Sequence, residues 1–234
     1  MLKGSHLWCR YGQRLRWVVR DQSLTVSPGE IVGLMAPSGY GKTTLAKLLA
    51  GYLSPSKGSV SVNGRSLPKK GYCPVQLVFQ NPELSVNPRW RIRQILAESH
   101  PFEAAGLDAL GIHPDWLSRY PHELSGGELQ RVAIARILNP STQYLIADEM
   151  TAMLDANTQA LIWQIVLAFV KQQQIGLIII SHDEPLLKRL CDTLLNIESE
   201  TSHPTKGDTP QERDRTHVIK TKNKADSQHE LTYR

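Results

Sequence analysis

A short glycine-rich segment, flanked by an apolar run and a leucine-rich stretch, constrains the fold more than any other feature of the chain. The segment reads APSGYGKTT from Ala36 to Thr44. It follows the run Glu30–Met35, which is typical of a buried strand, and precedes leucines at positions 45, 48, 49 and 53, whose spacing predicts a helix. The segment is close to the phosphate-loop pattern G-x-x-x-x-G-K-[ST] and lies between a strand and a helix, as that pattern requires.

The chemistry of this segment suits a nucleoside triphosphate. Small residues let consecutive backbone N–H groups point at phosphate oxygens, and the positive end of the following helix lies beside them. Lys42 can reach the β- and γ-phosphates, and Thr43 offers a hydroxyl to Mg²⁺. We therefore predict phosphate contacts from six residues of the segment: Ser38, Gly39, Gly41, Lys42, Thr43 and Thr44.

Two residues depart from the phosphate-loop pattern. Ala36 stands where the pattern has its first glycine, and Tyr40 is bulky for the inside of the loop. An alanine fits at position 36 only with a negative φ, because a Cβ penalises the left-handed region by about 1 kcal/mol or more.

Two carboxylates close the apolar run Tyr144–Ala147. In an α/β protein this places Asp148 and Glu149 at the C-terminal edge of a parallel sheet, where ligands bind. We predict that Asp148 holds Mg²⁺ through its water shell. Glu149 is expected to take a proton from the attacking water or to orient it.

The order of the remaining patterns predicts an α/β fold with a mainly parallel sheet. Further strands are expected at 17–19, 75–79 and 175–180, with helices from Ser125 onward and around 158–172. Residues 60–62 with the turn Asn63-Gly64 predict a short antiparallel hairpin arm.

Between residues 82 and 122 the strand patterns give way to short helical ones separated by prolines, which predicts an inserted helical subdomain. We therefore assign residues 1–81 and 123–197 to the core and 82–122 to this subdomain. From 198 to 234 the chain is polar and mixed in charge, which predicts a flexible tail without a packed core.

Composition excludes several classes of protein. The longest apolar stretch, Leu161–Val170, is too short to span a bilayer, and the N-terminal residues have no apolar secretory region. Three widely spaced cysteines favour neither a disulfide framework nor a zinc site. The formal charge of +5 is modest, so the arginines at 10, 14, 16 and 20 indicate a solvated strand face, and no nucleic-acid partner is expected.

A second glycine pair lies between the phosphate segment and the two carboxylates. The run LSGGE, Leu124–Glu128, leads into a helical stretch and resembles the signature of the ABC ATPase family. Ser125 can cap that helix, and the glycines let backbone amides approach a phosphate. Other positions resemble the same family in the same order: Gln80 its Q-loop, Leu154-Asp155 its D-loop, His182 its switch histidine, and Tyr11 the aromatic residue that stacks on adenine.

The resemblance covers about residues 3 to 197 and implies a P-loop NTPase fold that binds ATP and Mg²⁺. It implies a pair of ATP-binding subunits lying head to tail, in which Ser125, Gly126 and Gly127 face the γ-phosphate held by the partner, together with Asp155. It places Glu149, His182 and Gln80 in the catalytic group, and Thr43, Gln80 and Asp148 around Mg²⁺.

Residues 78–82 (VFQNP) and 85–89 (SVNPR) resemble the peptide and nickel importer branch of the family. Met150 and Met153 depart from its usual D-loop surroundings, the helical subdomain is short, and the cysteine-bearing C-terminal extension of many peptide importers is missing. These departures favour a small or metal-containing substrate.

The expected function is therefore ATP hydrolysis coupled to uptake of nickel, a metal chelate or small peptides. The expected place is the cytoplasmic face of the cell membrane, on permease subunits and, indirectly, a solute-binding protein. An exporter ATPase and a soluble ABC ATPase without a transport role are the alternatives; co-purification with an integral membrane protein would distinguish the second of these.

Overall fold

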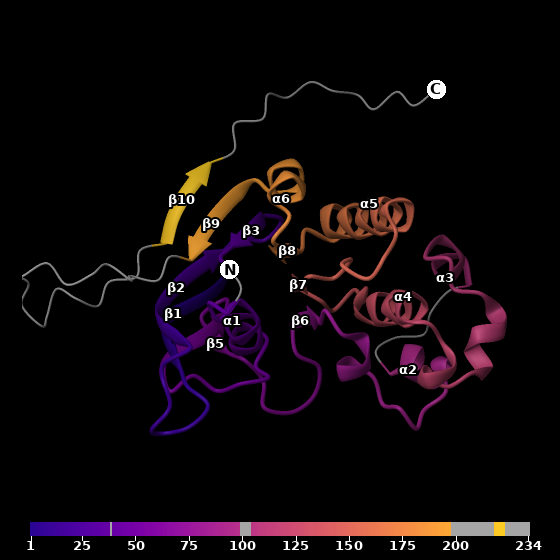
Figure 1. The fold of residues 1–234 in the computed structure, drawn as a ribbon, viewed down its shortest axis with the longest axis horizontal. Helices are drawn as coiled ribbons and strands as arrows, with labels where there is room; N and C mark the ends of the chain where they lie inside the picture. The colour runs from indigo at the N-terminus through magenta and orange to yellow at the C-terminus, as the bar shows by residue number, and fades with distance from the viewer. Residues whose placement is uncertain (38, 99–103, 198–217, 223–234) are drawn as a thin grey trace, which may run out of the picture.

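The computed structural model describes residues 1–37, 39–98, 104–197 and 218–222. Its central feature is a six-stranded sheet in the order β10-β9-β3-β8-β7-β6 (Figure 1). The strands of this sheet are β3 (Ile31–Met35), β6 (Val75–Val78), β7 (Tyr144–Asp148), β8 (Gly176–Ile180), β9 (Thr193–Ile197) and β10 (Val218–Lys222). The strands from β3 to β9 run parallel, which confirms the predicted mainly parallel sheet, although β9 was not predicted from the sequence; every residue of β7 and β8 is buried.

A second, antiparallel sheet has the order β2-β1-β4-β5. Its strands are β1 (Leu2–Cys9), β2 (Val19–Val26), β4 (Lys57–Val62) and β5 (Arg65–Ser66). The predicted hairpin arm is present: Asn63 and Gly64, with φ of 52° and 76°, connect β4 to β5. The predicted strand face of arginines is wrong for Arg10, Arg14 and Arg16, because they lie in the connection between β1 and β2; Arg20 lies in β2.

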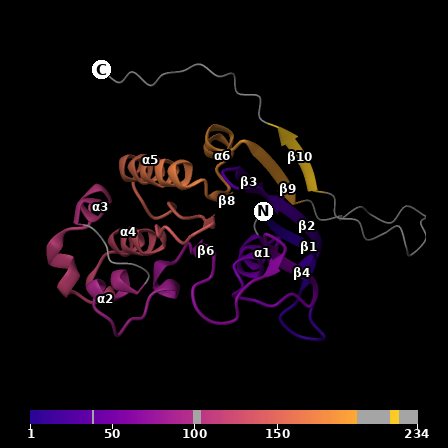
Figure 2. The ribbon, with the colours of Figure 1, turned by 180° about the vertical axis from the view of Figure 1, so that it is seen from behind.

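The central sheet is covered on both faces, which gives three layers (Figures 1 and 2). One face packs against α1 (Lys42–Leu49) and the antiparallel sheet; the other packs against α4 (Gly126–Ile137), α5 (Ala156–Gln173) and α6 (Glu184–Leu190). Alternate residues of β7 face the two sides: Ile146 packs with α1 and the antiparallel sheet, and Leu145 packs with α4 and α5. Burial on both faces explains the continuous apolar runs of the parallel strands.

The described elements between β6 and α4 are all helical, and they lie at the end of the molecule far from β10 (Figure 1). They are η1 (Pro82–Ser85), α2 (Ile92–Ala97), α3 (Ala104–Ala109), η2 (Pro114–Ser118) and η3 (Pro121–Glu123). Both η1 and α2 pack against α4. The division of the chain into a core and an inserted subdomain stays a prediction.

The strand β10 corrects one expectation. Residues 218–222 lie in the segment predicted to be a flexible tail, yet they pair antiparallel with β9 from Val218↔Ile197 to Lys222↔Thr193. Three of the five residues are β-branched, which favours a strand even in polar surroundings. The remainder of the predicted tail lies outside the described residues.

Candidate functional site

The phosphate segment forms a tight turn between β3 and α1. Gly39 and Gly41 have φ of 87° and 79°, and a Cβ on Gly41 would lie 2.5 Å from the Val18 carbonyl oxygen. Glycine is therefore required at position 41 by both backbone conformation and space. Ala36 is not among the residues with a positive φ, which satisfies the condition set by its Cβ. Ser38 lies outside the described residues.

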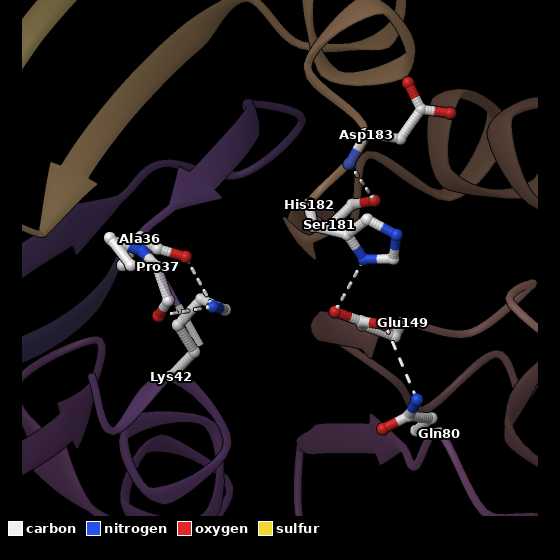
Figure 3. A network of polar contacts seen from close by, with 8 residues as sticks. All are labelled: Ala36, Pro37, Lys42, Gln80, Glu149, Ser181, His182 and Asp183. Carbon is white, nitrogen blue, oxygen red and sulfur yellow. Dashed lines mark hydrogen bonds and ion pairs between the residues drawn. The ribbon is translucent and has the colours of Figure 1, made fainter. Parts of the chain in front are cut away.

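The lysine of the segment is held by the loop itself. Its Nζ donates to the carbonyl oxygens of Ala36, at 2.5 Å, and Pro37, at 3.0 Å (Figure 3). Helix α1 begins at Lys42, and no side chain caps its N-terminus at Gly41. Its first backbone N–H groups therefore remain available to an anion, next to a concentrated positive charge.

Asp148, the last residue of β7, is buried beside this turn. Burial raises the pKa of its carboxyl above the ordinary aspartate value; a hydrogen bond from the Thr43 side chain opposes this rise, and the charge of Glu149 adds to it. A buried carboxylate beside a threonine hydroxyl fits Mg²⁺, which takes oxygen ligands and completes its shell with phosphates and water. Within the described ranges, no three His, Cys, Asp or Glu side chains group closely enough to hold a metal ion by themselves.

Glu149 lies at the centre of a small polar network (Figure 3). Its Oε1 is 3.1 Å from His182 Nδ1, and its Oε2 is 3.5 Å from Gln80 Nε2. Its backbone is left-handed, with φ of 49°, and its N–H donates to the Ile180 carbonyl oxygen at the end of β8. A left-handed non-glycine residue costs about 1 kcal/mol or more, so the sheet holds this carboxylate in an otherwise unfavourable conformation.

One open pocket brings most of the predicted residues together. It is lined by Val18, Gly39, Gly41, Lys42, Thr43, Thr44, Gln80, Asp148 and Glu149. Tyr11 joins its margin through a hydrogen bond of 3.0 Å between its hydroxyl and that of Thr44, while its ring is exposed. Val18 was missed in the sequence; its only signal is the short β-branched run that leads into β2.

The second glycine segment lies elsewhere. Ser125 and Gly126 are exposed at the start of α4 and do not line the pocket. Ser125 Oγ accepts from the Glu128 N–H at 3.3 Å, and Glu128 Oε2 accepts from the Ser125 N–H at 2.7 Å, so the two form a capping box. The hydrogen bond from the Ser125 N–H lowers the pKa of the Glu128 carboxyl.

Asp155, the D-loop acid of the predicted site, caps α5. Its carboxylate accepts from the Asn157 and Thr158 N–H groups and from the Thr158 hydroxyl. These bonds, led by that of the hydroxyl, lower its pKa. The preceding residue, Leu154, lies beside Gly127, so this loop and the second glycine segment are neighbours. Asp155 does not line the pocket, and its contact with a nucleotide stays a prediction.

The arrangement can bind a triphosphate and place a carboxylate near its terminal group. The loop amides and Lys42 supply positive charge, Thr43 and Asp148 supply oxygen ligands, and Glu149 supplies a base held by two neighbours.

Among the residues that the structure describes, no helix has the length and apolar character needed to cross a bilayer.

Known proteins resemble this chain in sequence. Residues 19–152 match the family described as ABC transporter. The putative oligopeptide transport ATP-binding protein of Bacillus subtilis is 34% identical over 191 residues, which are 72% of this chain. The oligopeptide transport ATP-binding protein of Haemophilus influenzae is 33% identical over 197 residues, which are 76% of this chain. It spans only 57% and 59% of the length of these two relatives. The nickel import ATP-binding protein of Escherichia coli is 35% identical over 201 residues, which are 78% of this chain and 75% of that protein.

Solved structures share the fold. A dimeric ATP-binding cassette in a post-hydrolysis state with ADP and Pi superposes with a TM-score of 0.70 at 21% identity, over 84% of this chain and 94% of that one. An Atm1-family exporter with ATP bound gives the same TM-score at 24% identity, over 84% of this chain and 37% of that one. The family match and the relatives together show that this chain belongs to the ATP-binding proteins of ABC transporters.

Proposed function

We propose that this chain hydrolyses ATP as one of two paired cassettes of an importer. The observation that carries the proposal is the convergence of Lys42, Thr43, Asp148 and Glu149 on one pocket, with Gln80 reaching Glu149 from the end of β6. The chemistry is that of phosphoryl transfer to water, in which positioning and charge stabilisation do most of the work.

Five residues of the pocket have separate roles in this reaction. Lys42 exchanges its two loop carbonyls for phosphate oxygens, because an ammonium makes stronger hydrogen bonds to a charged acceptor than to a neutral one. Thr43 would hold Mg²⁺ together with Asp148, which acts through the water shell of the ion, and Gln80 would be a further oxygen ligand; the ion, when bound, would neutralise charge on the phosphates. The raised pKa of Asp148 falls back once a cation replaces the lost solvation.

Glu149 is the general base of the proposal. His182 and Gln80 each contact one of its two carboxylate oxygens, which fixes the plane of the group. A water beside the γ-phosphate would lose its proton to this carboxylate. The left-handed backbone of Glu149 directs the side chain away from the line of β7 and into the pocket.

A second cassette completes the site. Ser125 and Gly126 are exposed and lie outside the pocket of their own chain, so the Ser125 hydroxyl and the Gly126 backbone amide can meet a phosphate held by a partner, while the Ser125 N–H is already bonded to Glu128. The partner is a second copy or a different cassette. If it is different, the two sites need not hydrolyse equally, and the unusual Ala36 loop is a candidate for the slower one.

The surface that follows Gln80 suits a membrane permease. Leu84 is 68% exposed, and Trp90 is partly exposed in the same segment, next to the helical elements that pack on α4. In the proposal, these two exposed apolar side chains are part of the surface that contacts the permease. The proposal therefore places the chain at the cytoplasmic face of the membrane, with a solute-binding protein as an indirect partner.

The proposed cargo is nickel, a metal chelate or a small peptide. Similar ATP-binding proteins are named for oligopeptide transport and for nickel import. Uptake of nickel and of a dipeptide into vesicles that contain the co-purified permease would distinguish the two. ATP-dependent efflux without uptake of either would support an exporter, whose cassette fold is the same.

The test of hydrolysis is Glu149→Gln in the full chain. It removes the base without changing the size of the side chain, so kcat should fall by about 10² to 10⁴-fold while ATP affinity persists. The matched control is Glu30→Gln, the same change just before β3 at the opposite edge of the sheet from Glu149, which should leave kcat unchanged. Full activity in Glu149→Gln would remove Glu149 from the mechanism.

A further inference from the structure

One buried amide joins the helix of the second glycine segment to the catalytic pocket. Gln130, in α4, has an exposed fraction of 0%, and its Nε2 donates to the Phe79 carbonyl oxygen at 3.2 Å. Its Oε1 is buried and has no hydrogen-bond partner within the part of the chain that the structure describes. The amide cannot be turned over without placing two oxygens together, so the carbonyl of Phe79 fixes its orientation.

The carbonyl that Gln130 holds belongs to the residue directly before Gln80. Phe79 follows the last residue of β6, and its ring is buried edge-on to Tyr52 with centroids 5.2 Å apart. The side chain of Gln80 then reaches Glu149 at 3.5 Å. That distance is at the outer limit of a hydrogen bond, so a backbone shift of about half an ångström at Phe79 makes or breaks the contact.

We infer that Gln130 is a positioning residue for the reaction: it ties the helix that begins at the second glycine segment to the backbone that presents Gln80 to Glu149. The inference rests on the proposed function, in which Gln80 acts on Glu149 and the bound cation. A displacement of α4 on contact with a partner cassette would pass through this bond to the Gln80 loop. The hydrogen bond from Gln130 to Phe79 therefore couples binding of a partner at the second glycine segment to the contact between Gln80 and Glu149.

Packing alone does not account for an amide at position 130. A buried acceptor without a partner lowers stability, and an apolar side chain of the same length would fill the space without that cost. The surrounding residues of α4, among them Leu129, Val132 and Ala133, are apolar and buried. What the amide adds is the bond to Phe79.

The test compares Gln130→Met with Gln22→Met in the full chain. Gln22, in β2, is the matched control: it is 4% exposed, its Nε2 donates to the Arg20 carbonyl oxygen at 3.1 Å, and its Oε1 likewise has no partner among the described residues. Both variants remove one buried amide of the same kind. Gln130→Met should lower kcat about three- to tenfold with ATP affinity changed less than twofold, and Gln22→Met should leave kcat unchanged.

A double-mutant cycle separates positioning from general destabilisation. In a Gln80→Ala background, Gln130→Met should have no further effect on kcat, because it acts through Gln80. Equal losses in both backgrounds would overturn the inference. If Gln80→Ala itself leaves kcat unchanged, the proposed role of Gln80 has failed instead.

Hydrogen exchange gives a readout that does not depend on activity. Peptides covering residues 78–85 should exchange faster in Gln130→Met than in the parent chain, and Gln22→Met should leave them unchanged. Unchanged exchange in Gln130→Met would show that the bond does not hold the Gln80 loop, and would also overturn the inference.

Discussion

Two glycines of the phosphate turn allow the cost of a close backbone approach to be measured by itself. Gly39 and Gly41 have similar positive φ, of 87° and 79°. A Cβ at position 39 meets nothing within 4 Å, whereas one at position 41 would lie 2.5 Å from the Val18 carbonyl oxygen. The variants Gly39→Ala and Gly41→Ala therefore share the conformational penalty and differ in the overlap.

The shared penalty is about 1–2 kcal/mol, the cost of a Cβ in a left-handed conformation. The overlap at Gly41 adds about 1–3 kcal/mol, because backbone must move to relieve it. With a denaturant dependence of about 3 kcal/mol per molar urea, this addition lowers the unfolding midpoint by a further 0.3–1 M, roughly, in Gly41→Ala relative to Gly39→Ala.

Urea denaturation followed by tryptophan fluorescence measures both midpoints in the nucleotide-free chain. ATP affinity, measured in parallel, should fall further in Gly41→Ala, because the displaced backbone is part of the pocket. Equal midpoints for the two variants would refute the reasoning, since they would show that the turn relaxes away from Val18 at no cost.

Three further outcomes are expected. Asp148→Asn should raise the free energy of unfolding of the nucleotide-free chain at pH 7 by about 0.5–2 kcal/mol and abolish stabilisation by MgATP. The folded-state pKa of Asp148 is raised, so its destabilising charge disappears as pH falls through that pKa. Urea denaturation at lower pH should therefore show a smaller gain in the free energy of unfolding. Thr151→Val should cost about 1–3 kcal/mol in the same assay, because the Thr151 hydroxyl accepts from Gln159 Nε2 at 3.0 Å and from the indole of buried Trp163 at 3.2 Å. Tyr11→Phe should keep ATP affinity within about threefold and Tyr11→Ala should weaken it about tenfold in a titration with a fluorescent ATP analogue, if the ring stacks on the base.

The parallel sheet and the phosphate turn could be predicted because their signals are contiguous. A strand buried on both faces needs an unbroken apolar run, and a backbone that cradles phosphate needs small residues, so both requirements leave local patterns. The Asp148-Glu149 pair follows from the same logic, since the end of β7 fixes its place at the sheet edge.

Other features could not be predicted, because they depend on contacts between distant segments. Val18 lines the pocket only because β2 begins beside the turn, and its carbonyl leaves no pattern in the sequence. The left-handed backbone of Glu149 accompanies a hydrogen bond to Ile180 on the neighbouring strand, a contact that no local pattern reveals. Gln130 follows the second glycine segment, yet nothing local shows that its amide meets Phe79.

The pairing of β10 with β9 has a consequence for how the protein is handled. Without residues 218–222, β9 would be the last strand on its side of the sheet, with a row of unpaired N–H and C=O groups beside the buried Leu194, Leu195 and Ile197. Such an edge is a template for another chain, and proteins normally protect it. A version cut after Ile197 would keep every residue of the pocket and still be prone to aggregate, so poor yield of that fragment would reflect an exposed strand rather than a damaged site.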